Sequence, residues 1–415
     1  MYSPEIIAKR LFAAKKAGLT PTRLPRERSL EISAKLELLR RNPRGELLPP
    51  GVLARPLDSA EHAFIDSERL LCKLDFSYYL SRYHSVEIDP GVNRGEGIGP
   101  ASPLESQEEF IRALGKREEI VHAEWAKYSH TEGIRVYAHK CRQVMFTATS
   151  RALTLHRMLF WSPCRAFAGT LEPDGCGELY KRDILSVERL PFWLSPGELY
   201  PNVKDQEIGF PSPLSSRLRY QPENQKTGIG VGTQVDVSHL TEVPLWRYPG
   251  QIGFSFAPAL PKSRMTLHIQ EGTSAGKGYW YEVSEGCRKK LPGYESWIYI
   301  FVPWWKNVSK YRSIVPDGWV PNNHTLDHAL LIERTSAEWN EGKTYRPTKS
   351  QLCWWQAERA KFARNGELGY FLANFPATPA QSFTNFNEGA LPAELLEEME
   401  MDLRPPIPYD VEVAA

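Results

Sequence analysis

The chain has 415 residues, of which 41% are hydrophobic and 24% charged, so it is expected to be globular with one large core or two ordinary ones. Its net charge of +1 excludes a protein that attracts nucleic acid through its overall charge. The six cysteines are scattered without a CxxC pair, which excludes a zinc ribbon and indicates a reduced, cytoplasmic protein. No apolar run approaches the ~18 residues that a membrane span needs, so no membrane contact is expected.

The N-terminal region is expected to be a basic helical appendage over residues 1–60, with helices over 4–17 and 29–41. The first fifty residues carry eleven Lys and Arg against five Glu. Such a segment is typical of contacts with DNA or an acidic partner, and a solvated helical face fits the same charge pattern. A helical stretch over 59–84 and a Gly- and Pro-rich break over 89–103 follow.

Beyond residue 103, strand-like and helix-like segments alternate. This alternation predicts an α/β fold with a mostly parallel sheet flanked by helices, in which ligands bind at the carboxyl ends of strands. The expected strands are 134–138, 165–171, 234–240, 264–270 and 297–302, and the expected helices are 105–114, 149–160, 177–189 and 349–364. The glycines of GIGVG at 228–232 precede a strand, so we expect a flexible loop there and not a dinucleotide fingerprint.

The first candidate site is KCRQVMFT, residues 140–147, at an expected strand-to-helix turn. A Walker A motif reads GxxxxGK[ST], and only Thr147 fits that pattern as written. Lys140 can still reach phosphates, the Thr147 hydroxyl can bind Mg²⁺, and Arg142 can add positive charge. Taken alone, the loop is better explained as an ordinary strand-to-helix turn with exposed basic residues.

Three further candidates lie elsewhere in the chain. Glu242 ends a strand, where an ATPase holds the carboxylate that orients water, but Thr241 replaces the usual preceding Asp. Residues 271–273 follow the next strand and could sense a bound γ-phosphate. Gln107 begins a helix and could bind adenine through its amide. Taken singly, each also fits a plain surface or turn role. The pairs Trp304-Trp305 and Trp354-Trp355 are expected to pack in a core and not to stack on bases.

Together and in this order, these segments resemble the ATPase half of a phage large terminase subunit, the motor that pumps DNA into a capsid. The resemblance is carried by residues 74–89, 103–107, 140–147, 238–246 and 270–278, with further likeness at 301–305 and 374–383. It covers roughly residues 65–390. It implies a P-loop NTPase fold of the ASCE type that binds ATP and Mg²⁺.

The resemblance also implies a role for each candidate residue. Glu242 would be the catalytic carboxylate, and Thr147 and Thr241 would hold the metal. The residues expected to bind ATP are Gln107, Lys140, Arg142, Gln143 and Thr147, and those expected to couple hydrolysis to movement are Glu271, Gly272 and Thr273. A neighbouring subunit would supply an arginine finger.

The implied function is ATP-driven translocation of double-stranded DNA into a procapsid, by a homo-oligomeric ring that contacts the portal protein and a small terminase subunit in the host cytoplasm. The expected domains are the appendage (1–60), an ATPase core (61–345), a lid or linker (346–390) and an acidic tail (391–415). The family's nuclease domain is expected outside this chain, since about thirty residues follow Phe383. The alternative, favoured by Met145 and Thr241, is a degenerate module that docks DNA or portal without hydrolysing ATP.

Overall fold

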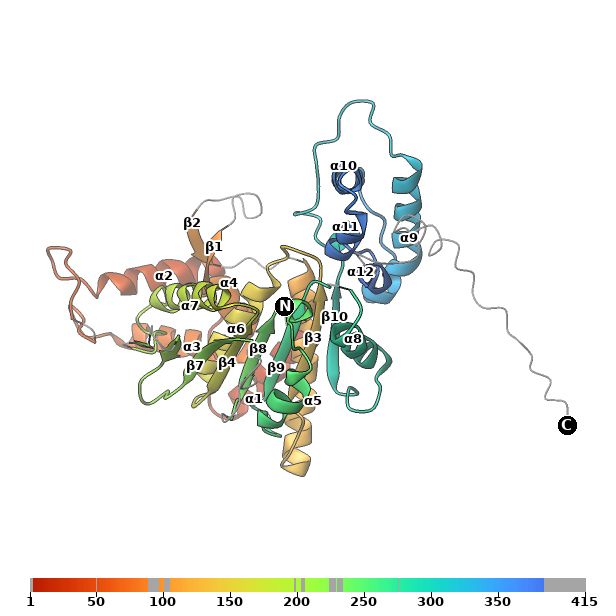
Figure 1. The fold of residues 1–415 in the computed structure, drawn as a ribbon. Helices are drawn as coiled ribbons and strands as arrows, with labels where there is room; N and C mark the ends of the chain where they lie inside the picture. The colour runs from red at the N-terminus through yellow and green to blue at the C-terminus, as the bar shows by residue number, and fades with distance from the viewer. Residues whose placement is uncertain are drawn as a thin grey trace. The chain divides into compact units, whose positions relative to one another are not determined.

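The computed structural model describes residues 3–49, 51–88, 97–100, 105–197, 199–202, 206–223, 229, 234–274 and 276–383. The acidic tail, most of the GIGVG loop and most of the break over 89–103 therefore lie outside the described residues. The chain divides into two compact units, one of residues 1–274 and 278–302, the other of residues 275–277 and 303–415 (Figure 1). The predicted domain ranges remain predictions. Among the described helices, none has the length and apolar character needed to cross a membrane.

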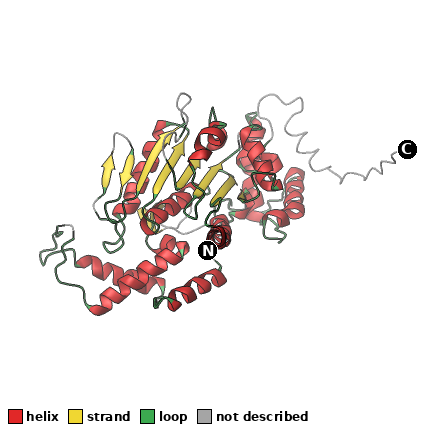
Figure 2. Ribbon diagram, turned by 90° about the horizontal axis from the view of Figure 1, so that it is seen from below, coloured by secondary structure: helices red, strands yellow, loops and turns green. Residues whose placement is uncertain are grey.

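The first unit is built on an eight-stranded sheet in the order β10-β3-β9-β8-β4-β7-β6-β5. The six strands from β10 to β7 are parallel, and β6 and β5 are antiparallel additions at one edge. The strands are β3 (Ile134–Lys140), β4 (Arg165–Thr170), β5 (Tyr200–Asn202), β6 (Glu207–Gly209), β7 (Arg217–Pro222), β8 (Val237–Thr241), β9 (Leu267–Gly272) and β10 (Trp297–Val302). Helices flank this sheet (Figure 2), so the predicted α/β class is confirmed.

The order of the central strands fixes which loops meet. Numbered along the chain, β3, β4, β8, β9 and β10 are the first to fifth, and they lie in the sheet in the order 5-1-4-3-2. This is the strand order of the ASCE class of P-loop NTPases. The inserted β9 separates the loop-bearing β3 from β8, so the carboxyl ends of three strands converge. All residues of β8 and β9 are buried, as expected for parallel strands covered on both faces.

Helices connect these strands and pack against them. Helix α6 packs on β4 and β8, α7 on β4 and β7, and α5 and α8 on β3 and β10. Their bounds are α5 (Glu105–Tyr128), α6 (Phe146–Phe160), α7 (Pro173–Glu188) and α8 (Tyr279–Lys289). Short helical turns η1 (Val243–Leu245), η2 (Ile252–Phe256) and η3 (Ala257–Ala259) follow β8, and a hairpin of β1 (Ser85–Ile88) and β2 (Gly97–Pro100) precedes α5.

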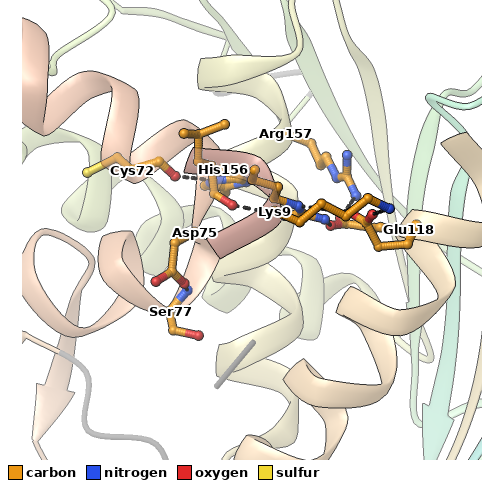
Figure 3. Close-up of polar contacts among 10 residues, drawn as sticks. Lys9, Cys72, Asp75, Ser77, Glu118, His156 and Arg157 are labelled. Atoms are coloured by element: carbon orange, nitrogen blue, oxygen red, sulfur yellow. Dashed lines mark hydrogen bonds and ion pairs between the residues drawn. The ribbon is translucent and has the colours of Figure 1, made fainter. Parts of the chain in front are cut away.

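The N-terminal helices pack on the rest of this unit through partly buried polar contacts. The Arg10 guanidinium donates to the Leu74 carbonyl at 2.9 Å and to Glu118 at 2.7 Å. Glu118 also pairs with Arg157 of α6, and Figure 3 shows these two side chains together. The bounds are α1 (Pro4–Lys16), α2 (Arg26–Leu38), α3 (Ser59–Leu74) and α4 (Phe76–Arg82). Asp75 divides the helical stretch expected over 59–84, because its extended backbone ends α3 and its carboxylate caps α4.

The second unit is helical and has an aromatic core. It contains η4 (Trp304–Lys306), α9 (Asn323–Trp339), α10 (Lys349–Arg364), α11 (Leu368–Asn374) and α12 (Pro379–Ser382). Trp304, Trp305 and Trp355 are at most 1% exposed, and the His328 ring stacks on Trp355 with centroids 4.0 Å apart. The predicted packing role of these tryptophans is confirmed.

Candidate functional site

Three parallel strands bring the main polar residues to one edge of the sheet. Lys140 is the last residue of β3 and Thr241 is the last residue of β8. Glu271, on β9 between them, is in register with Thr241 of β8 and Ala138 of β3. Because the carboxyl ends of parallel strands share an edge, residues separated by more than a hundred positions in the sequence become neighbours.

Lys140 lies between two carboxylates. Its Nζ is 3.0 Å from Glu242 Oε1 and 3.0 Å from Glu271 Oε2. Burial of Lys140 acts to lower the pKa of its ammonium, but the charges of Glu271 and Glu242 outweigh that effect and hold the pKa above its ordinary value. The ammonium is therefore fully charged at neutral pH.

Glu271 is fully buried. Burial acts to raise its pKa, but the Lys140 charge, His239 and the Thr147 hydroxyl outweigh it, so the pKa lies well below its usual range. Its Oε1 accepts hydrogen bonds from Thr147 Oγ1 at 2.6 Å and from Thr241 Oγ1 at 2.5 Å. His239 Nε2 is 3.4 Å from the same oxygen, and burial lowers the pKa of His239, which keeps the ring neutral.

The loop after β3 contains two residues with left-handed backbone. Gln143 and Met145 both have positive φ, at 56° and 53°, and Met145 is the N-cap of α6. Its side chain makes no capping hydrogen bond, so no side chain at the cap competes with a ligand for the first-turn N–H groups of this 15-residue helix. Arg142 and Gln143 are exposed on the loop, and Thr147 is half-buried in the first turn of α6.

Gln107 contacts this loop from the first turn of α5. Its Nε2 donates to the Val144 carbonyl at 3.1 Å, and the residue is only 3% exposed. Gln107, the residue predicted to bind adenine, therefore contacts the loop of residues 140–147. Its partner Val144 lies 37 positions further along the chain. In this structure the Gln107 amide stabilises the loop backbone through this hydrogen bond. Its contact with adenine stays a prediction.

Glu242 lies in a turn that is packed against the end of β9. Its backbone is left-handed, with φ of 55°, and it starts the short helix η1. A Cβ on Gly272 would come within 2.1 Å of Pro244 Cδ, so this close approach requires glycine at position 272. The lack of a side chain at Gly272 therefore lets the segment that carries Glu242 pack directly against the end of β9. Thr273, the next residue, is buried.

The assembled group offers a cation, two carboxylates and two hydroxyls at a strand-to-helix loop. This combination can bind phosphate through Lys140, accept a proton at the partly exposed Glu242, and supply oxygen ligands to a hard cation. Within the described ranges, no group of three or more His, Cys, Asp or Glu side chains is placed to hold a metal by itself. Oxygens from a ligand or water would therefore have to complete any metal shell.

All five members of this group were named as candidates from the sequence, but one relationship between them was not predicted. Lys140, Thr147, Thr241, Glu242 and Glu271 are joined by direct contacts. What the sequence did not predict is that Glu271 contacts both hydroxyls expected to hold metal. The only signal available was the EG pair directly after a strand, which does not reveal which strands are neighbours.

Comparisons with known proteins give weak likenesses. No protein-family model and no curated protein sequence matches the chain. The large terminase of bacteriophage HK97 is similar in structure, with a TM-score of 0.44 and 13% identity over 72% of this chain and 53% of that one. The chain thus spans about half the length of that protein. The ATPase domain of the Thermus phage P74-26 large terminase has a TM-score of 0.35 and 14% identity over 51% of this chain and 93% of that domain. Likenesses this weak do not by themselves assign a function to the chain.

Proposed function

We propose that this chain hydrolyses ATP at the carboxyl ends of β3, β8 and β9 and uses the energy to move double-stranded DNA. The observation that supports the ATPase part is Lys140, held 3.0 Å from Glu242 and 3.0 Å from Glu271 beside a loop whose helix lacks a side-chain cap. The packaging role rests on the sequence resemblance to terminase ATPases.

The catalytic roles follow from charge and exposure. Lys140 and the loop backbone bind the β- and γ-phosphates, and Arg142 and Gln143 lie exposed on the same loop. Glu242, 38% exposed, orients the attacking water and takes its proton. Lys140 now holds Glu242, so phosphate binding by this ammonium would release the carboxylate toward water. Substrate binding and activation of the base are linked in this way.

Mg²⁺ fits the oxygen donors of this site. Thr147 and Thr241 present hydroxyls that converge on one carboxylate oxygen, and hard cations prefer such oxygen donors. When bound with nucleotide, the ion neutralises charge on the phosphoryl group being transferred. Thr147 and Thr241 are the residues proposed to hold it, while Gln107 binds adenine and Gly272 and Thr273 transmit the state of the site.

The partners of this activity are proposals from the same resemblance. They are double-stranded DNA, a portal protein, a small terminase subunit and further copies of this chain in a ring, acting in the cytoplasm of an infected cell. The N-terminal helices are one candidate contact surface. Several of their basic residues already pair within the chain, among them Lys9, Arg10, Arg28 and Lys35. This leaves a smaller basic surface for DNA than the charge count alone indicates.

A second candidate is a module with this fold that docks DNA or portal without hydrolysis. Two observations favour it: Thr241 supplies no carboxylate at the end of β8, and Met145 places a half-buried side chain at the left-handed turn before α6. The two candidates differ in a single measurable property, nucleotide turnover.

DNA-stimulated ATP hydrolysis by the assembled motor separates these candidates. We expect turnover by the unmodified chain, a loss of at least about a hundredfold in Lys140→Ala and Glu242→Gln, and unchanged turnover in the matched controls Lys181→Ala and Glu178→Gln. These controls remove an exposed pair on α7. Nucleotide binding should survive in Glu242→Gln. No turnover by the unmodified chain would favour the docking module. Equal turnover in all five proteins would show that Lys140 and Glu242 do not carry out the hydrolysis.

A further inference from the structure

Strand β8 ends in Thr241, where the carboxylate that supports Mg²⁺ in related sites is expected. In P-loop ATPases an acid at the end of the strand that precedes the catalytic carboxylate helps to hold Mg²⁺. Here that position on β8 is Thr241, whose hydroxyl is a weaker donor for a divalent cation than a carboxylate would be. An active site therefore needs an anionic oxygen from another element.

Glu271 places such an oxygen at the same level of the sheet. It is the register partner of Thr241 on the adjacent parallel strand β9. Its Oε1 accepts hydrogen bonds from both Thr241 Oγ1 and Thr147 Oγ1. Because β9 lies between β8 and β3, its carboxyl end is nearer than β8 to the strand that carries the phosphate loop. A glutamate on β9 can thus occupy the place of an acid on β8.

The charge balance also points to a cation. Glu271 is fully buried, and its Oε2 has the Lys140 ammonium 3.0 Å away as counter-charge. An isolated ionised carboxylate cannot remain in so dry a position. When Lys140 turns to a phosphate, the buried carboxylate loses its positive neighbour, and a divalent cation arriving with the nucleotide restores the balance. The present ion pair is then the metal-free counterpart of a Mg²⁺-bound state.

We infer that Glu271 supplies the principal protein ligand for the nucleotide's Mg²⁺, in place of the acid that β8 lacks, which makes β9 the metal-supporting strand of this site. This inference rests on the ATPase function proposed above. It gives Glu271 a metal-binding role in place of the coupling role suggested by sequence. Thr147 remains the hydroxyl ligand, and the nucleotide phosphates and water complete the shell.

The test measures metal binding directly. Mn²⁺ replaces Mg²⁺, and its affinity for the protein–ATP-analogue complex is read by electron paramagnetic resonance with a non-hydrolysable analogue. Glu271→Gln keeps the shape and both hydroxyl contacts but removes the charge. We expect its Mn²⁺ affinity to fall by about tenfold or more, while metal-free nucleotide binding stays within about threefold. Thr241→Val should lower Mn²⁺ affinity much less.

A rescue variant distinguishes loss of a metal ligand from loss of folding. Thr241→Asp combined with Glu271→Gln returns a carboxylate to β8, and we expect it to regain most of the Mn²⁺ affinity that Glu271→Gln alone loses. Unchanged Mn²⁺ affinity in Glu271→Gln, or a larger loss in Thr241→Val, would overturn the inference while leaving the ATPase proposal intact. Absence of any nucleotide binding by the unmodified chain would overturn both, so the two failures are distinguishable.

Discussion

Replacing Lys140 with methionine would leave the buried carboxylate of Glu271 without its lysine counter-charge. Methionine keeps most of the side-chain volume, so the change is mainly electrostatic. Glu271 is 0% exposed and its Oε2 is 3.0 Å from Lys140 Nζ. Removing one member of such a buried pair typically costs about 3 to 5 kcal/mol. We expect Lys140→Met to lose that much unfolding free energy at pH 7.

The loss should depend on pH in a defined direction. In the unmodified protein the folded-state pKa of Glu271 lies below its ordinary value of 4.5, so the pair contributes stability above pH 4.5 that is lost as the pH falls through the folded pKa. Without Lys140, burial dominates and raises the folded pKa above the unfolded one. The variant therefore takes up a proton on folding, and its deficit narrows as the pH falls from about 8 toward about 5.

Hydrogen exchange at the β3 and β9 amides, followed by mass spectrometry, measures this locally. A single denaturation midpoint would mix the two compact units of the chain. Lys140→Met with Glu271→Gln should recover most of the loss, and Lys181→Met, which removes an exposed lysine, should change stability by less than about 0.5 kcal/mol. A loss below about 1 kcal/mol, or one that is constant between about pH 5 and 8, would refute the reasoning.

Three further predictions concern the loop, the β9 end and the N-terminus. Gly272→Ala should lower ATP turnover about tenfold or more, because the added Cβ would clash with Pro244 beside the turn that carries Glu242. Gly250→Ala should leave turnover unchanged in the same assay, because a Cβ at that position would meet no atom within 4 Å. Met145→Gly should retain or tighten binding of a fluorescent ATP analogue, because glycine relieves about 1 kcal/mol of strain in the left-handed backbone. A tenfold loss of binding affinity would show that the Met145 side chain supports the loop. Deleting residues 1–50 should weaken DNA binding in a salt-dependent assay more than basal ATPase, and equal loss of both would assign these helices to the core.

The parts of the fold that were predictable are those whose boundaries are marked locally. Strand β10 occupies the predicted residues 297–302, a run of aromatic and β-branched side chains. Helix α10 begins and ends as predicted, and the capping box of Thr348 and Gln351 marks its start. Strand β7 was not predicted, although its alternation of exposed and buried residues is typical of a strand, because it is short and ends in proline.

The candidate site was predictable residue by residue but not as a set of contacts. A strand-to-helix loop around Lys140 and a strand-end Glu242 follow from local pattern. The adjacency of β8 and β9, which pairs Thr241 with Glu271, depends on non-local strand order. From the sequence alone, Thr241 stands where an acidic residue is expected. The sheet places Glu271 within hydrogen-bonding distance of the Thr241 hydroxyl.

A structure of the chain with Mg²⁺ and a non-hydrolysable ATP analogue tests the central claim most directly. The account predicts the β- and γ-phosphates against the loop of residues 140–147, with Lys140 Nζ on a phosphate oxygen and Glu242 released from its present 3.0 Å pairing. A nucleotide bound elsewhere, or a nucleotide at this loop with Lys140 still bound to both carboxylates, would contradict it.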